Sequence, residues 1–245
     1  MKNKKIKNKM IIVCGGRGKR MGKITNNLPK PLIKVGKNPI IEHKIKYYSN
    51  QGIDKIIFCL GYKAKQLKNF LEKKTSNSIF SNGGLSAGIL KRIFLVKKYI
   101  NDDTFVSYGD TLAKINFKDL LNNHKKSRCC LTIVVAPIQN PFGLVKWNSN
   151  NKATIFNEKP ILNHFIGYAV INSNFFKKID QKLVDLKDGN GIIESIKFLI
   201  KKKQVNVYKF ENLQVTINSP DELRNARLNY KKYFTLWVHL EIKKF

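Results

Sequence analysis

Acidic side chains are scarce in this sequence. Sixteen aspartates and glutamates face 47 lysines and arginines, so the formal net charge of the 245 residues is +31. A charge of this size suggests a nucleic-acid partner. However, arginine, which can read phosphates and guanines with two parallel donors, is also rare, and no segment interleaves aromatic and cationic residues. The lysines are spread along the whole chain, which indicates a compositional bias rather than a binding patch. We therefore do not expect nucleic acid as the main partner, and attraction of small polyanionic substrates is a simpler use of the same charge.

Long apolar runs and cysteine pairs are missing too. No run approaches the roughly 18 apolar residues of a transmembrane helix, and the basic start MKNKKIKNKM lacks the apolar region and cleavage site of a signal peptide. These absences predict a cytoplasmic protein with no membrane partner. The cysteines form no CxxC motif and no metal-ligand spacing with histidine. We expect four free thiols in a reducing compartment, at Cys14, Cys59, Cys129 and Cys130.

The remaining composition favours one ordered domain. A hydrophobic share of 42% is enough to build a core, and no linker rich in proline, glycine or serine divides the chain. We predict a basic flexible tail at 1–9, one folded domain at 10–235 and an apolar C-terminal tail at 236–245.

Short apolar runs alternate with helical patterns along the chain. The predicted strands are 10–14, 55–60, 77–81, 104–108, 131–136, 143–147, 153–157, 166–171, 205–209 and 213–217. The predicted helices are 39–51, 63–73, 86–100, 117–125, 173–180, 191–203 and 219–233. The last helix has a start signal, with Ser219 as N-cap and Pro220 at the first position. Strands separated by helices predict an α/β layered fold with a largely parallel sheet.

The segment MIIVCGGRGKRM, residues 10–21, leaves an apolar strand through three glycines, Gly15, Gly16 and Gly18. Backbone N–H groups without side chains can approach an anion closely, so these glycines indicate a phosphate site. The spacing is not that of a dinucleotide fingerprint, since Met21 stands where the third glycine belongs. It is not a Walker loop either, because Ile24 follows Lys23 where a magnesium-binding hydroxyl would stand.

GGRGKRM, followed by LPKPLIKV at 28–35, resembles the signature of the sugar-nucleotide pyrophosphorylases. These nucleotidyltransferases join a nucleoside triphosphate to a sugar 1-phosphate. In that family the loop reads GGxGTRL, and a catalytic lysine lies in a PKP segment. The resemblance implies that Arg20 binds the triphosphate, that Lys30 is the catalytic lysine, and that the three glycines contact nucleotide. Lys19 replaces the usual threonine.

The resemblance continues in order to about residue 230. KYYSNQGIDKIIFCLGYK and LSAGILKR are similar to the glucose-1-phosphate cytidylyltransferase branch, which places Ser86 and Gly88 at the base pocket. FVSYGD matches a strand followed by a nucleotide-binding glycine, Gly109, and a magnesium-binding aspartate, Asp110. PFG, NEKP and HFIGYAV match sugar-side motifs. The residues that these motifs assign to the sugar are Gly143, Glu158, Lys159 and Gly167.

The family implies a Rossmann-like three-layer fold of the nucleotide-diphospho-sugar transferase type, with a central, mostly parallel mixed sheet. It implies Mg²⁺ as cofactor, a nucleoside triphosphate and a sugar 1-phosphate as substrates, and an NDP-sugar product for surface polysaccharide. CTP is favoured by the branch resemblance, while guanosine, uridine and thymidine stay open, as do the sugar and a homo-oligomeric state.

The implied chemistry needs no protein nucleophile, because the sugar phosphate is already an anion. Its oxygen would attack the α-phosphorus in line and expel pyrophosphate, so catalysis reduces to positioning and charge stabilisation. Arg20 would clamp the β- and γ-phosphates with its forked donors. Lys30 would neutralise charge near the α-phosphate and the incoming phosphate.

The segment QVTINSPDEL departs from the family, because Thr216 and Asn218 stand where relatives keep a second metal aspartate. Asn218 can still ligate magnesium through its amide oxygen, with weaker affinity than a carboxylate. Two alternatives to an active enzyme therefore stay open. One is a weak or inactive relative that binds nucleotide or sugar phosphate, and the other is a basic nucleic-acid-associated protein.

Overall fold

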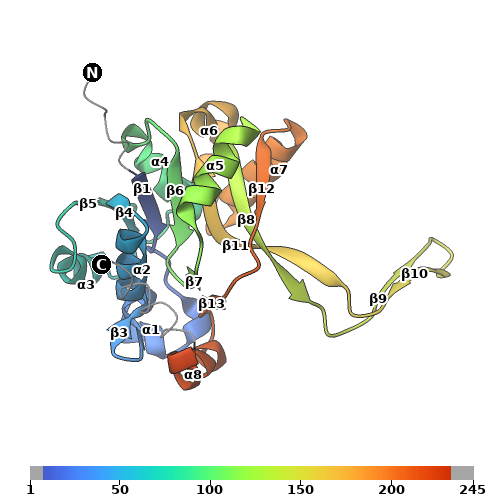
Figure 1. The fold of residues 1–245 in the computed structure, drawn as a ribbon, viewed down its shortest axis with the longest axis horizontal. Coiled ribbons are helices and arrows are strands. Elements are labelled where there is room, and N and C mark those ends of the chain that lie inside the picture. Colours follow the sequence, from blue (N-terminus) through green and yellow to red (C-terminus); the bar gives the residue numbers. More distant parts are fainter. Residues whose placement is uncertain (1–7, 233–245) are drawn as a thin grey trace, which may run out of the picture.

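The central sheet has seven strands in the order β12-β8-β11-β6-β1-β4-β5 (Figure 1). This computed structural model describes residues 8–232, so most of the predicted N-terminal tail and all of the predicted C-terminal tail lie outside the described residues. In chain order, the sheet strands are β1 (Asn8–Val13), β4 (Ile53–Leu60), β5 (Ser78–Asn82), β6 (Thr104–Tyr108), β8 (Leu131–Gln139), β11 (Ile161–Ile171) and β12 (Val205–Lys209). 

Only β11 runs against its neighbours in this sheet. It is antiparallel to β6 and β8, whereas the pairs β1–β4, β1–β6, β4–β5 and β8–β12 are parallel. The predicted α/β fold with a mostly parallel mixed sheet is therefore confirmed.

Helices cover both faces of the sheet and make it the middle of three layers. The helices are α1 (Ile24–Asn27), α2 (Ile40–Asn50), α3 (Ala64–Glu72), α4 (Ile89–Leu95), α5 (Phe117–Ser127), α6 (Ser173–Lys178), α7 (Asn190–Lys201) and α8 (Pro220–Leu228). Residues of α2, α3, α5 and α8 join one core cluster, and residues of α4, α6 and α7 join the other.

Strand β1 shows why the sheet lies between two cores. Met10 and Ile12 point into the first cluster, and Ile11 and Val13 point into the second. Successive side chains of a strand alternate between faces, so a strand covered on both sides must be apolar throughout. This requirement explains the uninterrupted run MIIV.

Three two-stranded pairs lie outside the main sheet, and two of them belong to the layered body. β7 (Thr111–Ala113) pairs antiparallel with β13 (Gln214–Thr216), and β2 (Lys34–Val35) pairs with β3 (Asn38–Pro39). The sequence patterns did not predict β7. Its pairing with β13 brings the chain around residue 216 next to the end of β6.

A hairpin extends away from the layered body (Figure 1). β8 and β11 continue as a pair out to Gln139 and Ile161, and they are joined by β9 (Leu144–Trp147) and β10 (Ala153–Asn157). We call residues 138–162 the arm. The predicted strand at 166–171 is therefore the inner half of a longer strand.

Two findings bear on the expectations from composition. All four cysteines are free, and three of them are buried, while Cys129 is partly exposed. Within residues 8–232, no helix is both long and apolar enough to cross a membrane.

Candidate active site

The glycine loop leaves β1 beside the end of β6. The two strands are parallel neighbours with Val13 opposite Tyr108, and the Gly109 N–H donates to the Val13 carbonyl at 3.0 Å. Ligand crevices of open α/β sheets lie at the carboxyl ends of such strands. The loops that carry Gly15, Gly16 and Asp110 therefore begin side by side.

Gly18 connects this loop to Lys30. Its φ of 67° lies in the left-handed region, which suits glycine, and a side chain there would press on the Lys30 Cβ at 3.2 Å. The Thr25 hydroxyl donates to the Gly18 carbonyl at 3.2 Å, and Met21 is fully buried below the loop. The backbone conformation of the loop is thus held from several sides.

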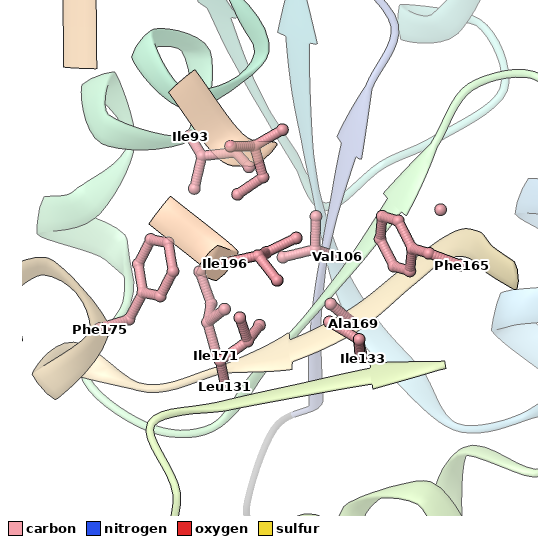
Figure 2. A pocket seen from close by; sticks show the side chains of 11 residues that line it. Ile93, Val106, Leu131, Ile133, Phe165, Ala169, Ile171, Phe175 and Ile196 are labelled. Carbon is pink, nitrogen blue, oxygen red and sulfur yellow. The ribbon is translucent and has the colours of Figure 1, made fainter. Parts of the chain in front are cut away.

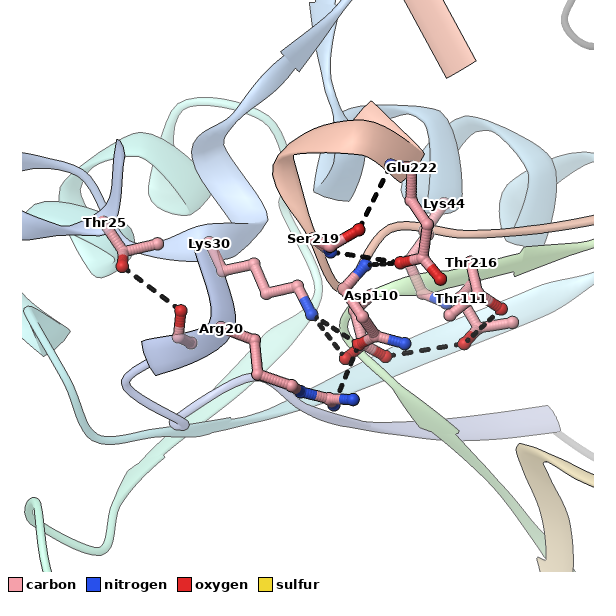
Figure 3. Close-up of polar contacts among 11 residues, drawn as sticks. Arg20, Thr25, Lys30, Lys44, Asp110, Thr111, Thr216, Ser219 and Glu222 are labelled. Atoms are coloured by element: carbon pink, nitrogen blue, oxygen red, sulfur yellow. Dashed lines mark hydrogen bonds and ion pairs between the residues drawn. The ribbon is translucent and has the colours of Figure 1, made fainter. Parts of the chain in front are cut away.

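Lys30 lies at the centre of a polar cluster (Figure 3). Lys30 is flanked by Pro29 and Pro31 and begins a short 3₁₀ turn, Lys30–Leu32. Only 8% of Lys30 is exposed. Its ammonium donates to Asp110 Oδ2 and to Asn218 Oδ1, both at 2.8 Å. We call Arg20, Lys30, Asp110 and Asn218 the phosphate cluster. A nearly buried ammonium with two oxygen partners is a preorganised positive charge.

Asp110 follows β6 and is fixed by its neighbours. Its backbone carbonyl accepts from the Ile217 N–H at 3.1 Å, and its Oδ1 accepts from the Thr111 hydroxyl at 3.4 Å. Thr111 in turn lies opposite Thr216 in the β7–β13 pair. The pairing explains how Asn218, 108 positions further along the chain, reaches Asp110.

Asn218 is held by the start of α8. Ser219 caps the helix, and its Oγ accepts from the Glu222 N–H at 3.2 Å. The Glu222 carboxylate accepts from the backbone N–H groups of Ser219, at 3.1 Å, and Asn218. This capping box confirms the helix start predicted from Ser219 and Pro220, and it leaves the Asn218 side chain directed at Lys30.

Arg20 joins the cluster from the glycine loop. Its Nη2 donates to Asn218 Oδ1 at 3.2 Å, and its side chain is exposed. An exposed guanidinium with one protein contact keeps donors that can reach an incoming anion. Arg20, Lys30, Asp110 and Asn218 were all singled out in the sequence, and the structure brings them together.

Sequence analysis missed Lys44, a buried lysine that lies next to the phosphate cluster. Its ammonium is fully buried and donates to the Thr111 carbonyl and, at 2.9 Å, to the Tyr168 hydroxyl. The Tyr168 hydroxyl also meets the Tyr48 hydroxyl at 3.0 Å. Burial lowers the pKa of Lys44 to about 7, while the nearby charge of Asp110 opposes this shift. A signal was available, because Ile40, Ile41, Lys44, Ile45 and Tyr48 recur at helical spacing on one face.

Arg92 is a second residue that the sequence analysis did not assign. It is buried, its Nη2 donates to the Gly84 carbonyl at 2.7 Å, and its Nη1 donates to the Leu60 carbonyl. A side chain at Gly15 would overlap the Arg92 guanidinium and the Leu60 backbone. Arg92 therefore ties the end of β4 to the loop after β5, and its guanidinium packs directly beside Gly15 of the first glycine loop.

The two residues predicted at the base pocket have different surroundings. Ser86 is exposed in the loop after β5. Gly88 is buried at the start of α4, where a side chain would meet the backbone of residues 186–188. The next N–H, that of Ile89, donates to the Asp188 carbonyl at 2.7 Å. Gly88 thus lets α4 approach this backbone segment, and its role toward a nucleotide stays a prediction.

The residues predicted for the sugar side do not join the phosphate cluster. Gly143, Glu158 and Lys159 lie in the arm, where Glu158 and Lys159 are exposed and Gly143 is partly exposed, and a side chain at Gly143 would lie 3.1 Å from Glu158 Oε2. Gly167 lies nearer the site. Its φ is 77°, and a side chain there would meet the ring of Tyr108 at 2.9 Å. The sugar roles of these four residues therefore stay predictions.

The donor set fits a magnesium ion that is bound together with phosphate. Among residues 8–232 there is no group of three or more histidine, cysteine, aspartate or glutamate side chains able to hold a metal ion. Asp110 and Asn218 offer one carboxylate and one amide oxygen. Magnesium is commonly held by one or two carboxylates plus substrate phosphates and water, so these two residues fit a metal that is completed by its ligand.

Comparisons with known proteins agree with this geometry. A probable glucose-1-phosphate cytidylyltransferase of Bacillus subtilis is 28% identical, over 94% of this chain and 98% of that protein. Mannose-1-phosphate guanyltransferase of Saccharomyces cerevisiae is 27% identical over 91% of this chain, which spans 64% of the yeast protein.

Solved structures share the fold at low sequence identity. HddC from Yersinia pseudotuberculosis, complexed with GMP-PN, matches 91% of this chain and all of its own, with a TM-score of 0.70 and 19% identity. A UDP-glucose pyrophosphorylase complexed with UDP-glucose matches 93% of this chain and 99% of its own, with a TM-score of 0.69 and 15% identity.

A family comparison decides the assignment. The sequence profile described as "Nucleotidyl transferase" matches residues 9–215, which include the glycine loop, Lys30, Asp110 and the arm. The family predicted from the glycine loop and the PKP segment is thereby confirmed, and this chain belongs to the nucleotidyl transferase family.

Proposed function

We propose that this protein is a sugar-1-phosphate nucleotidyltransferase, which joins a nucleoside triphosphate to a sugar 1-phosphate and releases pyrophosphate. The observation that carries the proposal is the phosphate cluster. Lys30 lies 2.8 Å from both Asp110 and Asn218, and Arg20 lies beside it at the carboxyl ends of β1 and β6. Family membership and the curated relatives support the same reaction class.

The reaction follows from the charges in this cluster. An oxygen of the sugar phosphate attacks the α-phosphorus in line, and the bond from that phosphorus to the pyrophosphate oxygen breaks. No proton transfer is required, since the attacking and leaving groups are both anionic. Catalysis is therefore a matter of alignment and charge neutralisation.

Arg20 and Lys30 neutralise the charge of different phosphates. The exposed Arg20 fork holds the β- and γ-phosphates and stabilises the departing pyrophosphate. The buried Lys30 ammonium neutralises charge at the α-phosphate, where two anions must approach each other. Its prolines and its contacts with Asp110 and Asn218 place it before the substrates arrive, so little reorganisation is needed.

Asp110 and Asn218 are the proposed magnesium ligands. When bound, the ion supplies Lewis-acid stabilisation of the phosphate oxygens. The two side chains are held for this role by the β7–β13 pair and the α8 capping box. Because Asn218 contributes a neutral oxygen, the affinity for magnesium should be lower than at a site with two carboxylates.

Cytidine is the base that we propose. The support is the similarity of residues 46–63 and 85–92 to the cytidylyltransferase branch, together with the Bacillus subtilis relative matched over nearly its whole length. Other relatives have guanyltransferase names, so GTP is the main competitor. On the sugar side, we propose that Glu158 accepts from sugar hydroxyls and that Lys159 binds the sugar phosphate.

The test is a matrix of CTP, GTP, UTP and TTP against several sugar 1-phosphates, with magnesium, read out as released pyrophosphate. We expect one CTP pair to exceed all GTP, UTP and TTP pairs. A GTP preference would overturn the base assignment and leave the reaction class intact. Nucleotide binding without turnover in any pair would indicate an inactive relative. Tight, salt-sensitive binding of DNA or RNA without turnover would favour the nucleic-acid alternative.

A further inference from the structure

A row of glycines crosses three adjacent strands of the central sheet at the point where these strands end. The register of β1 with β4, continued past the last pair, places Gly15 opposite Gly61, and the register of β4 with β5 places Gly61 opposite Gly83. The Gly83 N–H donates to the Leu60 carbonyl at 3.2 Å, and the Tyr62 N–H donates to the Gly15 carbonyl at 2.9 Å. Backbone pairing of the sheet therefore continues as far as this row.

The guanidinium of Arg92 lies against all three glycines. A side chain at Gly15 or at Gly61 would overlap the guanidinium, and a side chain at Gly83 would approach its Nη1 to 3.3 Å. Residues that stand opposite each other in a sheet point to the same face, which here is the face covered by α4. Arg92 comes from α4, and only 3% of it is exposed. The glycines therefore provide the space in which this buried side chain reaches the ends of three strands.

No carboxylate of residues 8–232 forms an ion pair with this guanidinium. Burial lowers the pKa of Arg92, and the ionisable groups that oppose this shift are two thiols, those of Cys59 and Cys14. The guanidinium donates instead to the Leu60 carbonyl at the end of β4 and, at 2.7 Å, to the Gly84 carbonyl after β5. Burying a charge without a counter-ion is unfavourable, so a side chain that only filled this space would be better apolar.

The helix that carries Arg92 is itself fixed to the rest of the fold. Ile93, the next residue of α4, is buried and lines, together with Ile196 of α7, an apolar cavity between the two helices and the sheet (Figure 2). At the start of α4, the Ile89 N–H donates to the Asp188 carbonyl at 2.7 Å. The helix fixes one end of the Arg92 side chain, and the backbone carbonyls fix the other.

The loops that leave this row carry the two groups of residues predicted to bind nucleotide. The loop after β1 is predicted to bind phosphates, and the loop after β5, which includes Ser86, is predicted to bind the base. Ligands of open α/β sheets bind outside the carboxyl ends of the strands, where both loops begin. Arg92 contacts Gly15 at the start of the first loop and the carbonyl of Gly84 in the second. The spacing of the two loops therefore depends on this side chain.

We infer that Arg92 is a positioning residue for the nucleoside triphosphate, which holds the loop after β5 at the distance from the loop after β1 that a nucleotide needs to contact both. The inference rests on the proposed function, because it requires a nucleotide that spans the two loops. A ligand made of phosphates alone contacts only the first loop, so its affinity should depend little on the second. Lysine would keep the charge of Arg92 but would lose the fork that reaches two carbonyls.

The experiment compares two ligands by calorimetry, with magnesium and without sugar 1-phosphate. One ligand is tripolyphosphate, and the other is whichever of CTP, GTP, UTP and TTP the unchanged protein binds most tightly. For Arg92→Lys, we expect the Kd of the nucleotide to rise about tenfold or more, in the range of a lost charge-assisted hydrogen bond, and the Kd of tripolyphosphate to stay within about twofold. For Arg92→Gln, which also removes the charge, both values should rise, and that of the nucleotide should rise about tenfold more.

Lys91→Met is the matched control. Lys91 is the neighbouring cation of α4, and its ammonium pairs with Asp185 at 2.8 Å instead of with the loops, so its loss should leave both Kd values unchanged. Circular dichroism and Tm report whether each variant is folded. Arg92→Gln leaves no buried charge, so it tests the inference if the lysine variant does not fold.

Three results would overturn the inference. One is an equal rise of the two Kd values in a folded variant, which would mean that Arg92 acts through its charge alone. Another is an unchanged Kd of the nucleotide, and the third is unfolding of both variants, which would make Arg92 a residue of the fold as a whole. Nucleotide binding without turnover in the unchanged protein would contradict the proposed function alone, because the binding measurement needs no reaction.

Discussion

The phosphate cluster and the arm differ in how their side chains are held. In the cluster, Lys30 is nearly buried and has two partners at 2.8 Å, and Asn218 is placed by a strand pair and a helix cap. In the arm, Glu158 and Lys159 are exposed and pair mainly with each other, at 3.7 Å. Both regions were expected to bind substrate. The comparison teaches that similar motif matches can lie on rigid and on exposed parts of one chain.

Replacing Arg20 should have the largest effect, because it removes a forked donor from the rigid region. We expect Arg20→Ala to reduce kcat/KM by roughly 3 kcal/mol, about 100-fold or more, in the range for losing one preorganised donor. Arg20→Lys should recover only part of this, since the fork is lost. Arg17 lies in the same loop and is also exposed, so Arg17→Ala is the matched control. Equal losses for Arg17→Ala and Arg20→Ala would mean that general loop charge, not the fork, matters.

The buried position of Lys44 can be tested through the pH dependence of the free energy of unfolding. Burial holds the pKa of Lys44 near 7 in the folded state, below the ordinary 10.5. Between pH 7 and 9 the unfolded chain therefore binds a proton that the folded chain lacks, so the free energy of unfolding rises with pH. The rise amounts to about 2 kcal/mol over these two pH units.

This rise should be absent in Lys44→Met, which fills similar space without a charge. Urea unfolding of both proteins at pH 6, 7, 8 and 9 measures the difference between them. We expect the free energy of unfolding of the unchanged protein to increase, relative to that of the variant, as the pH increases. Parallel curves would show that Lys44 stays protonated in its buried site.

A substitution of Lys159 tests whether this residue of the arm binds substrate. If it binds the sugar phosphate, Lys159→Ala should raise KM for the sugar 1-phosphate about tenfold, in the range of one charge-assisted hydrogen bond. The KM for the triphosphate should stay the same. Lys152 lies between β9 and β10 and serves as the control substitution. If the sugar KM of Lys159→Ala equals that of Lys152→Ala, Lys159 has no part in binding the sugar phosphate.

Asn218→Asp should have the smallest effect. A carboxylate in place of the amide would bind magnesium better, and the ammonium of Lys30 and the guanidinium of Arg20 would tolerate the added charge. We expect the half-saturating magnesium concentration to fall about threefold, a difference of less than 1 kcal/mol. A magnesium titration of pyrophosphate release measures it, and an unchanged midpoint would place residue 218 outside the metal shell.

The fold could be predicted because its signals are local. Apolar runs such as 10–14 must lie between two layers, and Ser219 with Pro220 begins a helix whatever surrounds it. β7 could not be predicted, because a strand of three residues owes its existence to its partner β13. The role of Lys44 was not identified from the sequence for a related reason. Its place on an apolar helix face is visible in the sequence, but its partners Thr111 and Tyr168 lie far along the chain, so no local pattern shows which groups it binds.

The site residues divide in the same way. Arg20, Lys30 and Asp110 lie in short motifs next to strand ends, so their convergence follows from the parallel order of β1 and β6. The position of Glu158 depends on the direction of a hairpin. That direction follows from the long pairing of β8 with β11, whose extent no local pattern records.

The contact between Lys30 and Asn218 also bears on when the site can form. The two residues are 188 positions apart, and Arg20 and Asn218 are 198 apart. During synthesis the glycine loop and β1 emerge first, yet the cluster lacks its last member until β13 and the cap of α8 have left the ribosome. Contacts of such long sequence separation form late, after the more local strand and helix pairs. Every chain therefore passes through a period in which its sheet can assemble around an incomplete phosphate site.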